Sequence, residues 1–266
     1  MAARSASFAL ITGATSGFGY EFVKLFAQDG YNLILVARDR DKLNALATEI
    51  SERHGVITIP LPKDLFDPRA AEELYQEIKA NNYRVDILIN DAGQGEHGPF
   101  ILNDLQRELK IIQLNIISLV VLTKLFLQDM VFRGYGRVLQ VASLLAKYPT
   151  PLMAVYGGTK AFVLSFSEAV TNELQGTGVS MTVMLPGASD TDFFNKAGAE
   201  NTVVANDTEL SDPAEVAKDG HDALFRGDKK IITGIRNKIQ GVVSNVLPDS
   251  KLAAQMRRQM EERDED

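Results

Sequence analysis

The sequence predicts an α/β fold: one doubly wound domain over residues 1–266, with a mostly parallel, seven-stranded sheet and helices on both faces. Two observations predict this fold. Short apolar runs alternate with helical patterns along most of the chain, which implies right-handed crossovers between parallel strands. Glycine-rich or polar turns follow the apolar runs, and in such sheets the turns at the carboxyl ends of the strands hold the ligand.

The expected strands lie near residues 7–12, 32–37, 56–61, 85–90, 136–142, 179–185 and 229–233. The expected helices between them lie near residues 18–29, 39–54, 68–81, 104–131, 154–175 and 213–226. A content of 45% hydrophobic and 24% charged residues is ordinary for a soluble globular domain.

The first strand leads into the turn Thr-Gly-Ala-Thr-Ser-Gly-Phe-Gly at residues 12–19 and then into a helix. Strand, glycine-rich turn and helix is the layout that places backbone N–H groups and a helix N-terminus against a pyrophosphate. Gly13 permits a tight turn, Gly17 lets the backbone approach phosphate, and Gly19 lets helix and strand pack closely. We expect dinucleotide binding here by Gly13, Thr15, Ser16, Gly17, Phe18 and Gly19; the plain alternative is an ordinary glycine-rich loop.

The second strand ends at Ala37, where NAD-binding proteins carry an acidic residue for the ribose 2′-OH. Arg38 follows instead, and its guanidinium is suited to pair with a 2′-phosphate. The sequence therefore predicts NADP(H) as the cofactor. NAD(H) is the alternative if Arg38 and Arg40 are solvated charges at the start of a helix.

The fifth strand is followed by Ser143, and the next helix carries Tyr156 and Lys160 four residues apart, so that their side chains share one helix face. A nearby ammonium favours phenolate and lowers the pKa of a tyrosine. Such a tyrosine can exchange a proton with a carbonyl or alcohol oxygen, to which the serine hydroxyl can hydrogen-bond. Taken alone, the tyrosine–lysine spacing is also common on solvated helix faces.

With these motifs in place, residues 7–235 resemble the short-chain dehydrogenase/reductase family, in its branch of roughly 250-residue proteins with a single-domain Rossmann fold. The glycine spacing of the turn and the Ser143, Tyr156 and Lys160 set match the family's cofactor motif and catalytic residues. The resemblance implies that Asn115 anchors a proton relay to the lysine. It implies further cofactor contacts by Asp64, Leu65, Asn90, Ala92, Gly93, Tyr156, Lys160, Pro186, Gly187 and Thr191.

Two of the chain's departures from the family pattern lie next to motif residues. Asn90-Asp91 replaces the usual Asn-Asn, although aspartate keeps an acceptor there. Two glycines, Gly157 and Gly158, follow the tyrosine, and each costs a helix about 1 kcal/mol relative to alanine. Neither departure touches a catalytic side chain, so we expect an active oxidoreductase.

The expected substrate pocket combines Ser143 and Tyr156 with Gln94, Leu145 and Phe193, and it has no cluster of lysine or arginine. An apolar carbonyl or secondary-alcohol substrate fits such a pocket better than a highly charged metabolite. The segment at about residues 188–211 is expected to be a substrate loop or lid. The charged tail at about residues 250–266 is expected to hold a solvated helix, with a partner-docking helix as the minority interpretation.

The net charge of −7 argues against a nucleic-acid or anionic-membrane partner, and without cysteine there is no disulfide or zinc–thiolate site. We expect no catalytic metal, a cytoplasmic location, and no membrane span, because the apolar stretch at 111–132 is interrupted by polar residues. The apolar helices near 111–132 and 155–174 predict a homodimer or homotetramer. Two alternative functions remain open: a 3-oxoacyl-type reductase, and a catalytically silent NADP(H)-binding sensor or interaction protein.

Overall fold

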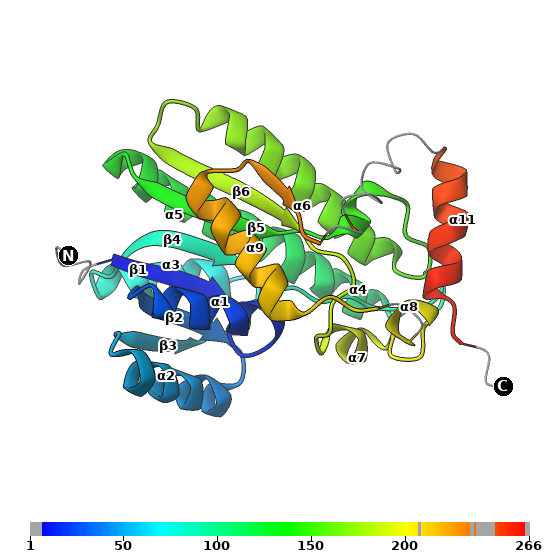
Figure 1. Ribbon diagram of the computed structural model, residues 1–266, viewed down its shortest axis with the longest axis horizontal. Helices are drawn as coiled ribbons and strands as arrows, with labels where there is room; N and C mark the ends of the chain where they lie inside the picture. The colour runs from blue at the N-terminus through cyan, green and yellow to red at the C-terminus, as the bar shows by residue number, and fades with distance from the viewer. Residues whose placement is uncertain (1–6, 207–208, 235–236, 238–247, 264–266) are drawn as a thin grey trace.

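The computed structural model describes residues 7–206, 209–234, 237 and 248–263 (Figure 1). Residues 1–6, 207–208, 235–236, 238–247 and 264–266 lie outside this description. They belong to the predicted domain, and some of them to the predicted lid and tail. Seven parallel strands form one sheet in the order β3-β2-β1-β4-β5-β6-β7, which confirms the predicted fold class. The strands are β1 (Ser7–Thr12), β2 (Asn32–Ala37), β3 (Thr58–Pro62), β4 (Arg84–Asn90), β5 (Gly136–Val141), β6 (Val179–Leu185) and β7 (Lys230–Ile232).

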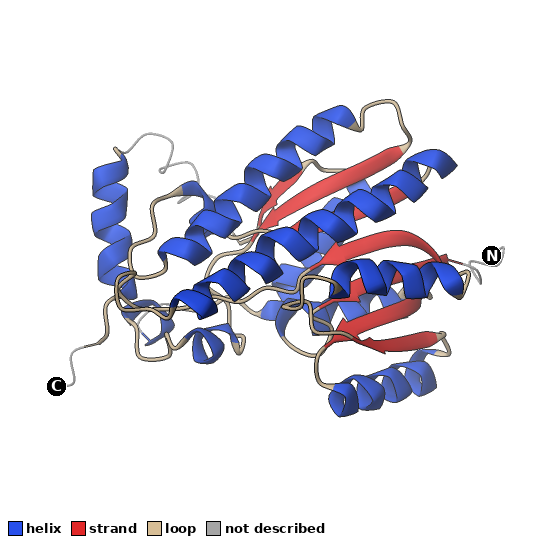
Figure 2. Cartoon of the chain, turned by 180° about the vertical axis from the view of Figure 1, so that it is seen from behind, coloured by secondary structure: helices blue, strands red, loops and turns tan. Residues whose placement is uncertain are grey.

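Helices cover both faces of this sheet. They are α1 (Gly17–Gln28), α2 (Arg40–His54), α3 (Ala70–Ala80), α4 (Leu105–Ile112), α5 (Leu119–Arg133), α6 (Ala154–Glu173) and α9 (Pro213–Arg226). Figure 1 shows α1 and α9 on the near face, and Figure 2 shows long helices across the opposite face. Shorter helices α7 (Phe193–Ala197) and α8 (Val203–Asn206) follow β6, and α11 (Asp249–Met260) comes last.

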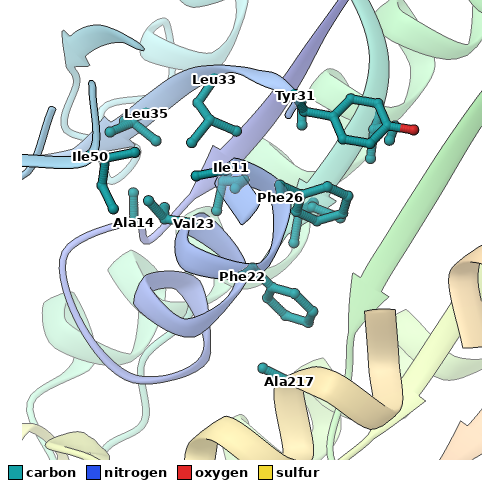
Figure 3. Packing of buried hydrophobic residues seen from close by; sticks show 14 of the residues in the cluster. Ile11, Ala14, Phe22, Val23, Phe26, Tyr31, Leu33, Leu35, Ile50 and Ala217 are labelled. Atoms are coloured by element: carbon teal, nitrogen blue, oxygen red, sulfur yellow. The ribbon is translucent and has the colours of Figure 1, made fainter. Parts of the chain in front are cut away.

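Alternating side chains of the central strands divide the core into two layers. Ile11 and Leu33 face the layer under α1, α2 and α9, which also contains Phe22 and Phe26 (Figure 3). Leu10 and its neighbours on the same side belong to the layer under α3 and α5. A strand with both faces buried reads as a continuous apolar run, which explains why these strands are visible in the sequence.

Local signals fix the helix boundaries. The side chains of Asp39, Asp104 and Asp212 accept hydrogen bonds from backbone N–H groups at the starts of α2, α4 and α9. Gly55 and Gly134 end α2 and α5 in the left-handed conformation. The predicted boundaries therefore agree with the structure to within a few residues.

The long helix predicted near 104–131 contains a π-helical segment, Gln113–Ser118, between α4 and α5. By length and apolar composition, Leu105–Arg133 also resembles a membrane span, but half of its apolar window is buried inside the protein. A core helix of a soluble protein passes the same test, so this helix is weak support for a membrane.

The expectation of a solvated C-terminal helix is wrong for one face of α11. Leu252, Met256 and Met260 are buried. These residues recur every four positions and therefore form one apolar stripe on the helix. The charged residues between them lie on the other side, and they dominated the composition on which the expectation was based.

Candidate active site

The carboxyl ends of the strands open into one large cavity of about 1030 Å³. Its walls come from the glycine-rich turn after β1, the ends of β4, β5 and β6, the segment 186–196, and α11. A volume of this size suits a dinucleotide together with a small substrate.

The glycine-rich turn has the shape of a cradle for a phosphate group. Gly13 and Gly17 adopt positive φ angles of 73° and 54°. A Cβ on Gly19 would overlap the Gly13 carbonyl oxygen, so only glycine lets α1 begin this close to β1. The hydroxyl of Thr12 accepts hydrogen bonds from the backbone N–H groups of Asp91 and Ala92, both at 3.1 Å, and so ties this turn to the end of β4. The cradle fits a dinucleotide pyrophosphate at the N-terminus of α1.

Ser143, Tyr156 and Lys160 meet inside the cavity. Ser143 lies just beyond β5, its side chain is hydrogen-bonded to the Tyr156 hydroxyl, and its Oγ also accepts the Leu145 N–H at 3.1 Å. Lys160 Nζ lies 5.8 Å from the centroid of the Tyr156 ring. It donates to the Val141 carbonyl oxygen at 2.8 Å.

The protonation states of the pair differ from the sequence expectation. Burial raises the pKa of Tyr156 above its usual value, the Ser143 hydrogen bond lowers it, and the nearby Asp91 raises it further. The expected lowering by Lys160 is therefore wrong in this arrangement, because the ammonium is directed to a backbone carbonyl. Burial lowers the pKa of Lys160 to about 8, against the opposing influence of Asp91.

Asn115 is buried in the π-helical segment. Its side chain exchanges two hydrogen bonds with the backbone of Gln94, at 3.0 and 2.9 Å, and donates to Thr159 Oγ1 at 2.9 Å. A Cβ on Gly93 would lie 3.3 Å from Lys160 Nζ and 3.5 Å from Asn115 Oδ1. The bare backbone of Gly93 thus lets the lysine and the asparagine approach each other.

The described residues of the segment predicted to be a lid, residues 188–211, line part of the cavity and include α7 and α8. The Phe193 ring lies 4.9 Å from the Tyr156 ring, and Thr191 Cγ2 lies 3.4 Å from the Cβ position of Gly17. Lys196 Nζ donates to Ser16 Oγ at 3.2 Å and pairs with Asp192 at 3.1 Å. The lid therefore contacts both the catalytic tyrosine candidate and the phosphate cradle.

The C-terminal helix closes the far side of the cavity. Met256 and Met260 line it, and Met260 joins an apolar cluster with Tyr156. The Met260 carbonyl lies 2.6 Å from His97 Nε2, and the Glu261 carbonyl accepts the Val203 N–H of the lid at 3.1 Å. Figure 1 shows α11 at the same end of the molecule as α7 and α8.

Most of the predicted site residues line this one cavity: Ser16, Gly17, Phe18, Gly93, Gln94, Ser143, Leu145, Tyr156, Lys160, Pro186, Gly187, Thr191 and Phe193. Gly13 and Gly19 lie directly behind it. Arg38 is exposed beyond β2 and stacks 5.0 Å from the Phe66 ring centroid.

Other predicted residues support the site from outside the cavity wall. Asp64 is exposed and accepts the Phe66 N–H at 3.2 Å. The Leu65 carbonyl accepts a hydrogen bond from the Ser118 hydroxyl at 2.7 Å. Asn90 is buried, and its Nδ2 donates to Thr123 Oγ1 at 3.0 Å. Thr15, Ala92 and Asn115 are likewise absent from the cavity lining.

Sequence reasoning missed three cavity residues of note: Asp91, Lys196 and Met260. Asp91 could have been found from the sequence, because it occupies a position where the family that the chain resembles usually has asparagine. Met260 carried a weaker signal in its four-residue repeat with Met256 and Leu252. Lys196 carried none, because its approach to Ser16 joins positions 180 residues apart.

The parallel sheet, the glycine cradle and the serine, tyrosine and lysine at the strand ends define a nucleotide-binding oxidoreductase. Residues 7–202 match the short chain dehydrogenase family, and the chain belongs to this family. The predicted family is therefore confirmed.

Among curated proteins, the chain is 36% identical over 189 residues to a probable NADP-dependent dehydrogenase of Haemophilus influenzae, covering 70% of this chain and 73% of that one. It is 34% identical over 184 residues to the very-long-chain 3-oxoacyl-CoA reductase of Bos taurus, covering 67% of this chain but only 58% of that protein. A solved short-chain dehydrogenase from Sphingobium yanoikuyae in complex with NADPH has a TM-score of 0.80 at 28% identity, covering 97% of this chain and 99% of that one.

Proposed function

We propose that the protein transfers a hydride reversibly between NADP(H) and an apolar substrate, to the carbonyl carbon of a ketone or aldehyde or, in reverse, from the hydroxyl-bearing carbon of a secondary alcohol. The observation that carries the proposal is the hydrogen bond between Ser143 and Tyr156 beside Lys160, in the same cavity as the glycine cradle. The bound nicotinamide supplies the hydride. The residues of the chain bind the cofactor, orient the substrate and transfer the proton.

Tyr156 is the general acid of the reductive direction. Because burial raises its pKa, the phenol is protonated at neutral pH and holds the proton that a carbonyl oxygen needs as it becomes an alkoxide. Ser143 orients that oxygen. Lys160, held by the Val141 carbonyl in the same cavity, contributes to cofactor binding, and Asn115 fixes the backbone of Gln94 beside the lysine.

The NADP(H) preference rests on Arg38. The neighbouring Asp39 caps α2 by accepting the Lys42 N–H at 3.0 Å, so its carboxylate is used locally. Phe66 supports the guanidinium from one side, which leaves the N–H edges of Arg38 available for a 2′-phosphate. The complex of the Sphingobium yanoikuyae relative with NADPH supports this preference.

Replacing Arg38 by alanine should therefore weaken NADPH binding and leave NADH binding nearly unchanged. Loss of a charge-assisted pair is worth about 1.5–3 kcal/mol, or roughly 10- to 100-fold in Kd. Fluorescence titration with NADPH and with NADH measures the change in Kd for each cofactor. Arg53→Ala, at the other end of α2, is the matched control. Equal losses for NADPH and NADH would contradict the 2′-phosphate role.

The substrate class follows from the apolar part of the cavity. Leu145, Phe193 and Met260 line it in the same apolar cluster as Tyr156, Met256 lines it in the cluster with Tyr148, and Gln94 is among the polar lining residues. A 3-oxoacyl thioester is the second candidate, favoured by the likeness to the Bos taurus reductase. NADPH consumption with purified protein against ketones, aldehydes and 3-oxoacyl thioesters separates the candidates. Tight NADPH binding without turnover on any of them would favour the sensor alternative.

We also propose a two-fold symmetric oligomer built on the outer faces of α5 and α6. Phe132 on α5 is 92% exposed and Phe162 on α6 is 40% exposed. Val131 on α5 and Ile117, in the π-helical segment that leads into α5, are also exposed. An apolar surface of this kind favours association with a second copy. Light scattering at micromolar concentration should give a dimer or tetramer, and Phe132→Glu should shift the protein towards monomer. A wild-type monomer across that range would refute the proposal.

A further inference from the structure

Asp91 places a carboxyl group where the phosphate cradle is most favourable to an anion. It follows β4 directly, and its Oδ2 lies 3.0 Å from the Cβ position of Gly13 and 2.8 Å from that of Gly19. The backbone N–H of Gly19, in the first turn of α1, donates to this carboxyl group. The side chain therefore uses part of the helix N-terminus that the diphosphate of a dinucleotide would also use.

The charged and titratable groups facing Asp91 come from the helices around it. Lys160 and Tyr156 face it from α6, and Lys196 faces it from α7 in the lid. Lys160, the Gly19 N–H and Lys196 favour the carboxylate, but burial outweighs them and raises the pKa of Asp91 to about 7. At neutral pH the group is therefore close to half protonated.

We propose that Asp91 takes up a proton when NADP(H) binds, so that the diphosphate meets a neutral carboxylic acid and not a carboxylate. The inference rests on the proposed function, because it assumes this cofactor. A carboxylate beside the diphosphate would repel it at short range in a poorly solvated site, whereas a carboxylic acid would not. An asparagine at this position would need no proton.

The sign of the pH dependence follows by linkage. A bound anion disfavours the carboxylate and raises the pKa of Asp91, so binding takes up a proton between the pKa of the free protein, about 7, and the higher pKa of the complex. Below that window the acid is already protonated and Kd is constant. Within it, Kd rises by up to about tenfold per pH unit, and above it Kd is constant again.

The test is isothermal titration calorimetry of NADP⁺ binding to wild type and Asp91→Asn, at pH 6.5–8.5, in two buffers of different ionisation enthalpy. The wild type should take up about half a proton at pH 7, and Asp91→Asn should lose most of that uptake and bind with a flatter pH profile. Lys160, with a pKa of about 8, contributes little proton uptake at pH 7 in the wild type. The titration of the 2′-phosphate is common to both proteins.

Asp192→Asn is the matched control. Asp192 also lines the cavity, but hydrogen bonds from Asn195 and Lys196 lower its pKa, so it stays ionised and this variant should keep the wild-type proton uptake. If Asp91→Asn does not fold, infrared difference spectra of the wild type serve instead, with a carboxylic acid C=O band expected to grow as NADP⁺ binds. Equal uptake by wild type and Asp91→Asn, or no uptake by a wild type that binds NADP⁺, would overturn the proposal. Absence of any dinucleotide binding would instead overturn the proposed function.

Discussion

Tyr156→Phe should reduce kcat by at least about 100-fold while NADPH binding stays within a few-fold of wild type. The substitution removes only the phenolic oxygen, which holds the proton for the carbonyl and is hydrogen-bonded to Ser143. The ring remains packed 4.9 Å from that of Phe193, so the cavity keeps its shape. Steady-state NADPH oxidation on the best substrate measures the loss, and fluorescence titration measures the binding.

Tyr148→Phe is the matched control for that variant. Tyr148 lines the same cavity, and its hydroxyl has no hydrogen-bond partner among the described residues. Removal of its hydroxyl should leave kcat within a few-fold of wild type. Equal turnover by wild type and Tyr156→Phe would refute the assignment of the general acid.

Gly19→Ala should weaken NADP(H) binding by more than about tenfold, because one methyl group requires the whole cradle to move. The new Cβ would overlap the Gly13 carbonyl oxygen and lie 2.8 Å from Asp91 Oδ2. Relief requires a shift of α1 away from β1, and overpacking of this kind also costs about 1–3 kcal/mol of stability. NADPH titration and thermal unfolding report the two effects separately.

Gly158→Ala tests whether the effect is specific to the cradle. Gly158 lies within α6, and nothing is found within 4 Å of its Cβ position. Alanine there should stabilise the protein by about 0.5–1 kcal/mol and leave NADPH affinity unchanged. If Gly19→Ala behaved like Gly158→Ala, the close approach at the cradle would not matter for the cofactor.

The layered fold could be predicted because its signals are local. The strands are buried on both faces and therefore appear as apolar runs, and the helices are bounded by aspartate caps and C-terminal glycines. The arrangement of Ser143, Tyr156 and Lys160 was equally accessible, since a strand end and an i,i+4 helix pair determine it. These features depend on neighbours in the sequence.

The rest of the site depends on distant contacts. Spacing places Lys160 on the same helix face as Tyr156, but it does not reveal that burial raises the pKa of the tyrosine or that Val141 accepts the ammonium. The contact of Lys196 with Ser16 and the packing of α11 against the lid are also products of tertiary structure. The sequence contained the apolar stripe of α11 but not the surface that it covers.

Because of the position of α11, the shape of the far cavity wall can change independently of the residues proposed for proton transfer. Ser143, Tyr156 and Lys160 lie just beyond β5 and on α6, whereas part of the cavity wall lies on residues 249–260, which pack against the lid, loop 94–98 and the segment 144–148. Exchange of Met256 for a larger or smaller side chain would reshape the far wall without changing the apolar cluster around Tyr156, to which Met260 belongs. Under the proposed function, substitutions on this one peripheral helix would alter the range of substrates while Ser143, Tyr156 and Lys160 stay the same.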